Sequence, residues 1–190
     1  MKKLSTLIKL LAPVIAMLTT PVAQATMTLD NEQSTISFVS IKKGTTAEVH
    51  TFSNLSGTLS DEGNLSIDIE LDSVQTNVDI RNTRMREMLF ETMQFPSAEL
   101  TALVSTPIPD GSMTPINVEA LLSLHGATAN INVHALATRV DGQLLVTNTQ
   151  PVIVNAGDFG LVPGIEALRQ VAKLSSIPIA VPVSFTLVFR

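Results

Sequence analysis

Three histidines are the residues of this chain best suited to binding a metal ion or moving a proton. They are His50, His125 and His134, and the chain contains no cysteine. A zinc site needs three or four converging histidine, cysteine or carboxylate ligands. These histidines lack the spacing at which two ligands share a helical turn. We therefore predict no metal and no cofactor, and we interpret His125, which precedes Gly126, as a turn residue whose imidazole hydrogen-bonds the loop.

Three arginines, Arg81, Arg84 and Arg86, form the other cluster suited to chemistry. A guanidinium binds a carboxylate or diphosphate through paired hydrogen bonds, so the cluster could hold the anionic headgroup of a ligand. The alternative is a solvated helix face on which Arg84 pairs with Glu87, with Glu91 nearby. The sequence leaves both interpretations open.

The serines do not indicate covalent catalysis. None lies in the Gly-x-Ser-x-Gly pattern of a nucleophile elbow, and no Ser-His-Asp triad can be assembled by motif. We therefore expect that this protein is not an enzyme.

Strands are the main elements available to position these residues. The run 179–189 has an apolar side chain at every odd position, and the run 65–71 alternates leucine or isoleucine with polar residues. This period of two predicts strands with one buried face, as in antiparallel sheets. Asp141-Gly142 predicts a hairpin turn. The other predicted strands are 35–41, 47–52, 55–59, 100–105, 116–124, 130–138, 143–149 and 152–155.

Two segments show helical spacing instead. Asp79 to Met93 combines apolar residues at helical intervals with a charged side, and Pro96 ends it. Pro163 to Leu174 has proline in its first turn and an apolar stripe that includes Ile165 and Leu168. We predict a helix over each segment.

The first 25 residues predict an export signal. Lys2 and Lys3 precede a short apolar run over 10–18, and the segment Ala23-Gln24-Ala25 has the small residues that signal peptidase recognises. The run is shorter than the roughly 20 apolar residues of a membrane anchor. We predict cleavage after Ala25, a single domain over residues 26–190, and a periplasmic protein.

The negative charge of the chain excludes some classes of binding partner. The formal net charge is −5 for the whole chain. Without Lys2, Lys3 and Lys9, residues 26–190 have nine basic and seventeen acidic residues, a charge of −8. Nucleic acids and anionic lipid headgroups are both bound through basic patches, so the acidic charge argues against both, and we predict no nucleic-acid partner. Because there is no cysteine, no disulfide stabilises the exported chain.

Many short strands with two helical insertions suggest a closed barrel or a two-sheet sandwich. The ten predicted runs favour roughly eight barrel strands, because short runs are easily misassigned. A barrel of about eight strands can hold one small ligand, whereas a sandwich packs its inner faces solid. The pattern alone does not choose between them.

The order of motifs resembles the YceI family of exported lipocalin-like proteins over essentially all of residues 26–190. The helix ends in a phenylalanine-proline pair, Phe95-Pro96, where most relatives have tyrosine-proline. The two most specific motifs are Leu122 to Thr128 and Asp158 to Gly160, which lie about thirty residues apart. The segments that carry the resemblance are Ser34-Thr35-Ile36-Ser37-Phe38, Val49-His50-Thr51-Phe52-Ser53-Asn54-Leu55-Ser56-Gly57, Asp72-Ser73-Val74-Gln75-Thr76 with Arg81, Gln94-Phe95-Pro96-Ser97-Ala98, Leu122-Ser123-Leu124-His125-Gly126-Ala127-Thr128 and Asp158-Phe159-Gly160.

The resemblance implies an all-β fold, an eight-stranded antiparallel lipocalin-like barrel with one or two helical insertions. It also implies an apolar tunnel that binds a polyisoprenoid or another long-chain lipid in the periplasm. The chain departs from the family where relatives usually have arginine-aspartate followed by histidine-leucine, because it reads Arg81-Asn82-Thr83-Arg84-Met85. It has seven phenylalanines and no tyrosine or tryptophan. The wall of the tunnel should therefore be aliphatic and rich in thioethers.

The residues expected to line a ligand site come from the inward positions of the strands and from the first helix. The alternative is that these side chains fill a solid core. The candidates are Phe38, Val49, Ile67, Ile69, Arg81, Arg84, Met85, Leu89, Leu122, Leu124, Ile131, Val133, Val183, Phe185 and Leu187.

Two functions follow from these alternatives. The first is a carrier for a long-chain apolar lipid, a polyisoprenoid, isoprenoid quinone or fatty acid. The second is a structural or interaction protein with a self-filled barrel. A membrane electron-transfer partner and a homodimer are further possibilities, and the sequence decides neither.

Overall fold

The computed structural model describes residues 26–105 and 107–190. The predicted export signal lies outside the described residues. Within them, no helix is both long and apolar enough to cross a bilayer.

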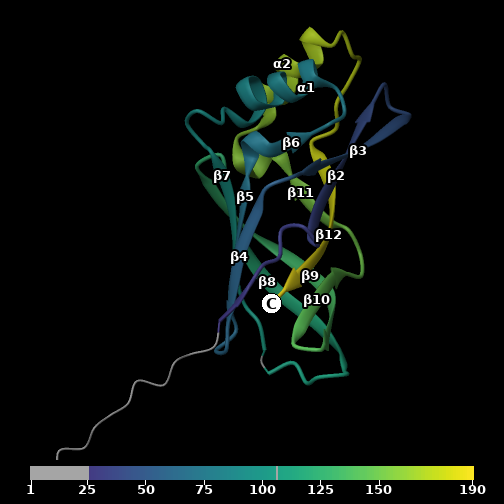
Figure 1. Cartoon of the computed structure of the whole chain (residues 1–190). Coiled ribbons are helices and arrows are strands. Elements are labelled where there is room, and N and C mark those ends of the chain that lie inside the picture. Colours follow the sequence, from purple (N-terminus) through teal and green to yellow (C-terminus); the bar gives the residue numbers. More distant parts are fainter. Residues whose placement is uncertain (1–25, 106) are drawn as a thin grey trace, which may run out of the picture.

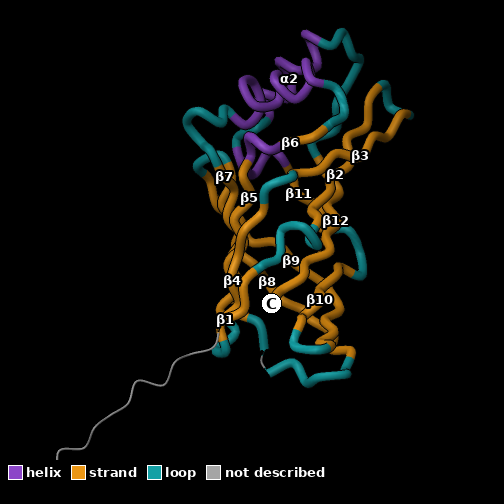
Figure 2. Tube along the Cα trace, in the orientation of Figure 1, coloured by secondary structure: helices purple, strands orange, loops and turns teal. Residues whose placement is uncertain are grey.

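The described residues contain twelve strands, which belong to one sheet (Figures 1 and 2). Every strand pair in this sheet is antiparallel. The strands are β1 (Thr26–Thr28), β2 (Thr35–Lys42), β3 (Thr46–Phe52), β4 (Leu55–Ser60), β5 (Asn64–Glu70), β6 (Val74–Gln75), β7 (Ser97–Leu103), β8 (Met113–Leu124), β9 (Ala127–Val140), β10 (Gln143–Asn148), β11 (Val152–Asn155) and β12 (Ala180–Phe189).

The sheet curls until its two sides meet. Its strand order is β1-β4-β5-β7-β8-β9-β10-β12-β2-β3-β6, and β11 pairs with β12. The segment after β1 joins β4 to β12, because the Leu29 amide donates to the Gly57 carbonyl at 2.9 Å and the Asp30 amide to the Val188 carbonyl at 2.8 Å. The predicted all-β antiparallel barrel architecture is confirmed.

The strand number differs from the predicted eight. All ten predicted runs are strands, with bounds shifted by a few residues. The two additional strands, β1 and β6, have three and two residues. Such short segments show no measurable alternation, so pattern reasoning misses them.

Two helices lie at one end of the barrel (Figure 1). The first, α1 (Asp79–Arg84), continues as a π-helix, η2 (Met85–Phe90). It ends three residues before the predicted Met93, because Glu91 is left-handed at φ 48° and its amide bonds back to the Arg86 carbonyl. The second, α2 (Val162–Val171), has Pro163 in its first turn as predicted and ends before Leu174. Two short 3-10 helices, η1 (Leu71–Ser73) and η3 (Ala156–Phe159), complete the elements.

A glycine allows the two helices to pack closely. A Cβ on Gly164 of α2 would lie 2.5 Å from the Met88 carbonyl oxygen and 2.9 Å from the Leu89 Cα, both in η2. Only a residue without a side chain permits this separation. The helices therefore form a joined cap over one end of the barrel.

Candidate functional site

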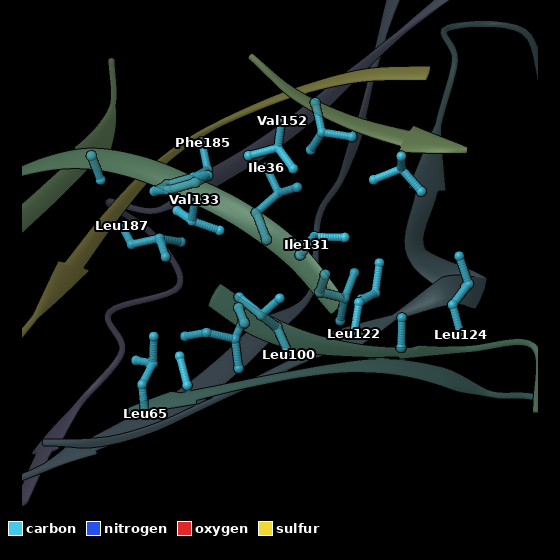
Figure 3. A pocket seen from close by; sticks show the side chains of 18 of the residues that line it. Ile36, Leu65, Leu100, Leu122, Leu124, Ile131, Val133, Val152, Phe185 and Leu187 are labelled. Atoms are coloured by element: carbon cyan, nitrogen blue, oxygen red, sulfur yellow. The ribbon is translucent and has the colours of Figure 1, made fainter. Parts of the chain in front are cut away.

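The barrel encloses an apolar cavity of about 220 Å³ (Figure 3). All of its lining side chains are isoleucine, leucine, valine, phenylalanine or alanine. Polar side chains and the predicted thioethers are both missing from this wall. Met85 of η2 is buried in a cluster of apolar side chains that includes Phe90 and Ile165, and it does not line the cavity.

Strand alternation builds the wall. In β12 the odd positions Val181, Val183, Phe185, Leu187 and Phe189 all line the cavity. In β5 the cavity-lining residues, 65, 67 and 69, also alternate. Successive side chains of a strand point to opposite faces of the sheet, so the period of two seen in the sequence places these residues correctly.

The cavity is long and narrow rather than round. Its wall follows β12 from Val181 to Phe189, and eight residue steps of about 3.3 Å give a length of about 26 Å along the strand. With the usual strand tilt of about 40°, the length along the barrel axis is about 20 Å. A single bilayer leaflet offers about 15 Å to a hydrocarbon chain. The cavity is therefore longer than one leaflet.

Different elements cover the two ends of the cavity. At the helical end, Leu89 and Phe90 of η2 and Leu161 and Ile165 of the α2 segment complete the wall. At the opposite end, Val104 and Ile108 of the loop between β7 and β8 do so. Strands form the wall between these ends.

Inward-facing alanines leave the space that larger residues would fill. Five line the cavity from the strands: Ala98, Ala102, Ala120, Ala135 and Ala137. Sequence reasoning missed them, because alanine is common on both faces of a strand. The available signal was their place in the alternation, since Ala135 and Ala137 continue the inward positions of β9 after Val133.

Eleven of the fifteen predicted site residues line the cavity. The remaining four, Val49, Arg81, Arg84 and Met85, do not. The eleven are Phe38, Ile67, Ile69, Leu89, Leu122, Leu124, Ile131, Val133, Val183, Phe185 and Leu187.

The prediction for Val49 is wrong because the parity of β3 is opposite to the one assumed. In the β2–β3 pair, Phe38 lies opposite His50, and Val39 lies opposite Val49. Paired residues in an antiparallel sheet share a face. His50 therefore points inward with Phe38 and is 2% exposed, whereas Val49 points outward and is 61% exposed.

Three phenylalanines from separate elements meet near the helical end. Phe38 and Phe52 have ring centroids 5.4 Å apart, and Phe52 and Phe90 have centroids 5.9 Å apart. All three line the cavity. Phe52 and Phe90 were not among the predicted site residues.

Arg81 belongs to an ion-pair network rather than to the cavity wall. Its Nη1 donates to Glu48 Oε2 at 2.6 Å, and its Nη2 donates to the Thr76 carbonyl at 2.6 Å. Lys42 Nζ donates to the other Glu48 oxygen at 2.8 Å. The hydrogen bond from Lys42, followed by Arg81, holds the pKa of the Glu48 carboxyl below its ordinary value of 4.5. The network ties α1 to the β2–β3 hairpin.

The other two arginines have separate environments. Arg86 lies 3.8 Å from the Asp72 carboxylate and donates to the Asn82 carbonyl. Arg84 is half-buried and makes no hydrogen bond or ion pair with any described residue, so the proposed pair with Glu87 does not form. The three guanidiniums thus do not share one anion site.

The three histidines also lie apart. His50 Nε2 is 2.8 Å from Ser40 Oγ, and its ring packs edge-on against Phe38. Burial, reinforced by the charge of Arg81, lowers its pKa, so this imidazole stays neutral at pH 7. His125, at φ 52°, occupies a turn and contacts Glu91 at 2.8 Å, and His134 contacts Asn117 at 2.6 Å. No three metal-ligating residues gather anywhere in the described residues.

A curled antiparallel sheet around a wholly apolar cavity defines a class of β-barrel proteins, those that enclose one small apolar molecule. The family follows from comparison. The model of the YceI-like domain matches residues 27–189, and the chain belongs to this family.

Two solved structures show the same fold. A polyisoprenoid-binding domain from Saccharophagus degradans, implicated in plant cell wall breakdown, is 37% identical and superposes with a TM-score of 0.83; the match covers 88% of this chain and 98% of that one. BcnA from Burkholderia cenocepacia is 18% identical with a TM-score of 0.68, over 84% of this chain and 98% of that one. No curated protein matches the chain.

Proposed function

We propose that this protein is a periplasmic binding or carrier protein for a long-chain apolar lipid held inside the barrel. The observation that carries this proposal is the cavity wall, which presents only hydrocarbon side chains. An apolar tail needs no hydrogen bond, and each buried CH₂ contributes about 0.8 kcal/mol. A chain of ten or more carbons can therefore supply micromolar affinity even after the costs of association.

The comparisons favour a polyisoprenoid or an isoprenoid quinone over a fatty acid. A wall longer than one leaflet suits an extended chain of any of these classes. A relative at 37% identity is a polyisoprenoid-binding domain. The ligand's polar group has to lie outside the wall, because an unpaired polar group in an apolar site costs several kcal/mol.

Binding without catalysis is the role that this wall supports. General acid–base or nucleophilic catalysis requires a titratable or nucleophilic side chain within reach of the reacting atom. The described residues that line the cavity include none.

The proposal is tested by mass spectrometry of an organic extract of protein purified from the periplasm without detergent. We expect a long-chain lipid in near-stoichiometric amount. An empty extract, repeated after the protein has been offered isoprenoids, quinones and fatty acids, would reject the carrier function and favour the self-filled barrel.

Two adjacent leucines of β8 provide matched variants for this experiment. Leu122 lines the cavity and Leu121 is exposed on the outer face. We expect Leu122→Gln to lose most of the bound lipid and Leu121→Gln to retain it. Equal loading of the two folded variants would show that the lipid lies elsewhere.

A further inference from the structure

The charge of the described residues is divided unevenly between the helical end of the barrel and the rest of the chain. We define the helical end as residues 42–49, 71–96 and 156–179, which contain the β2–β3 tip, α1, η2, η3 and α2. Seven acidic and seven basic residues lie there, so this end is formally neutral. They are Lys42, Lys43, Glu48, Asp72, Asp79, Arg81, Arg84, Arg86, Glu87, Glu91, Asp158, Glu166, Arg169 and Lys173.

The rest of the described chain carries the whole negative charge. It contains ten acidic residues against Arg139 and Arg190, a net charge of −8. Four of the acidic residues, Asp61, Glu62, Asp110 and Asp141, lie in the turns and the loop opposite the helices. The other six are Asp30, Glu32, Asp68, Glu70, Glu99 and Glu119.

The helical end also exposes apolar side chains on three separate segments. Val49 of β3 is 61% exposed, Ile80 of α1 is 57% exposed, and Val171 of α2 is exposed as well. Basic residues occur in the same segments: Lys42 and Lys43 in the β2–β3 hairpin, Arg84 in α1, and Lys173 after α2. Arg84 lies four residues after Ile80 and therefore on the same side of α1.

Three cations at this end have no ionic partner among the described residues. Lys43, Arg84 and Lys173 form none of the ion pairs of the described residues, whereas Lys42, Arg81, Arg86 and Arg169 are each paired with a carboxylate. Three carboxylates of this end, Asp79, Glu87 and Asp158, form none of these ion pairs either. Unpaired cations beside exposed apolar side chains are the combination that binds the surface of an anionic bilayer. The opposite end, with its acidic turns, is repelled by such a surface.

We propose that the helical end docks on an anionic lipid bilayer, so that the cap of η2 and α2 faces the source of the lipid. This inference rests on the proposed function, since the cavity needs access to a membrane. The cap is the part of the wall at this end that is not held by strand hydrogen bonds, and Leu89, Phe90 and Ile165 on its underside contact the cavity.

Vesicle flotation with the protein lacking residues 1–25 tests the docking. The probes are bilayers of equimolar phosphatidylglycerol and phosphatidylcholine, and bilayers of phosphatidylcholine alone. We expect binding to the anionic vesicles that weakens with added salt. Failure of the wild-type protein to float with them would overturn the proposal.

Two valines with similar exposure serve as matched variants. Val49 belongs to the helical end, whereas Val140, 54% exposed, lies beside the turn at the opposite end. Burying half of a valine side chain is worth a factor of about three in affinity, so we expect Val49→Gln to weaken binding about threefold and Val140→Gln to leave it unchanged. If both substitutions weakened vesicle binding equally, or if Val49→Gln had no effect, the proposed orientation would be overturned. The exposed side chains of the helical end would then be assigned to an interaction with another protein.

The double variant Lys43→Gln and Lys173→Gln tests the contribution of charge. Each cation near an anionic bilayer contributes about fivefold, so we expect a loss on the order of twentyfold on anionic vesicles and no change on phosphatidylcholine. Unchanged binding to anionic vesicles would overturn the electrostatic part of the proposal.

A separate readout distinguishes this inference from the proposed function. Lipid delivered from cyclodextrin, without a bilayer, should load each of these surface variants that melts at the wild-type temperature. Normal loading without vesicle binding overturns the docking alone. Absence of loading in the wild-type protein rejects the proposed function.

Discussion

At the residue scale, two arginines of α1 differ in their contacts, because Arg81 has ionic and hydrogen-bond partners and Arg84 has none among the described residues. Arg81 is held by Glu48 and by the Thr76 carbonyl, and its Nε is buried without a hydrogen-bond partner among the described residues. Arg84, three residues later, has no such partner. Both residues are arginines, so the difference between the structural role of Arg81 and the surface position of Arg84 comes only from the residues around them.

Replacing Arg81 by alanine should destabilise the protein without emptying the cavity. The change leaves the half-buried Glu48 and the Thr76 carbonyl without this donor, so we expect the free energy of unfolding to fall by about 1–3 kcal/mol. Urea unfolding measures the change, and Arg84→Ala, expected to lie within about 0.5 kcal/mol of the wild type, is the control. Loss of lipid at unchanged stability in Arg81→Ala would restore the headgroup interpretation.

The Glu48 carboxyl should make the protein less stable in acid. Its pKa in the folded state is lower than the ordinary 4.5, so its contribution is fully present above that value and is lost as the pH falls through the lowered pKa. As the pH falls through this range, we expect the free energy of unfolding to decrease less in Glu48→Gln than in the wild type. Urea unfolding at a series of pH values tests this, and identical pH profiles would contradict it.

At the scale of elements, the closure of the helical end of the cavity depends on the contact between α2 and η2. Strand hydrogen bonds hold the rest of the wall, whereas this cap is held by side-chain packing and by the approach of Gly164 to the backbone of Met88 and Leu89. A π-helix at this position is consistent with a functional role, because such helices occur frequently at functional sites.

Gly164→Ala should therefore destabilise the protein, although alanine normally stabilises a helix by about 1 kcal/mol relative to glycine. The added Cβ would meet the Met88 carbonyl oxygen, and we expect a loss of about 1–3 kcal/mol from overpacking. Thermal unfolding measures it, with the exposed Gln170→Ala as a control. A raised melting temperature for Gly164→Ala would show that the helices are not packed this closely.

At the scale of the whole molecule, location and function are linked. A carrier of membrane lipids is useful in a compartment that adjoins a bilayer, and the sequence predicts export to such a compartment. The neutral charge of the helical end, against −8 for the rest of the described chain, is the basis of the orientation that we propose near an anionic surface.

The mature protein should begin at Thr26. We expect cell fractionation to recover it from the periplasm and intact mass spectrometry to give the mass of residues 26–190. Ala25→Arg should block cleavage, because signal peptidase requires a small residue there. A wild-type protein that keeps residues 1–25, or that stays in the cytoplasm, would contradict the prediction.

The sequence determined most of the secondary structure and eleven residues of the cavity wall, because both follow from local periodicity. Alternation in the segments of β5 and β12 identifies inward residues such as Ile67 and Phe185 without any knowledge of neighbouring strands. The order of short motifs was also sufficient to predict the family, which the match over residues 27–189 confirms.

Only the tertiary structure decided the features that depend on register and on distant partners. The pairing of Phe38 with His50 sets the parity of β3 and turns Val49 outward, a choice that a single strand does not encode. Glu48 and Arg81 are 33 residues apart in the chain, so their ion pair, and the exclusion of Arg81 from the cavity, appear only when α1 lies against the hairpin. The cavity itself has the same cause: local alternation selects which side chains point inward, but the curl of the whole sheet decides whether they meet.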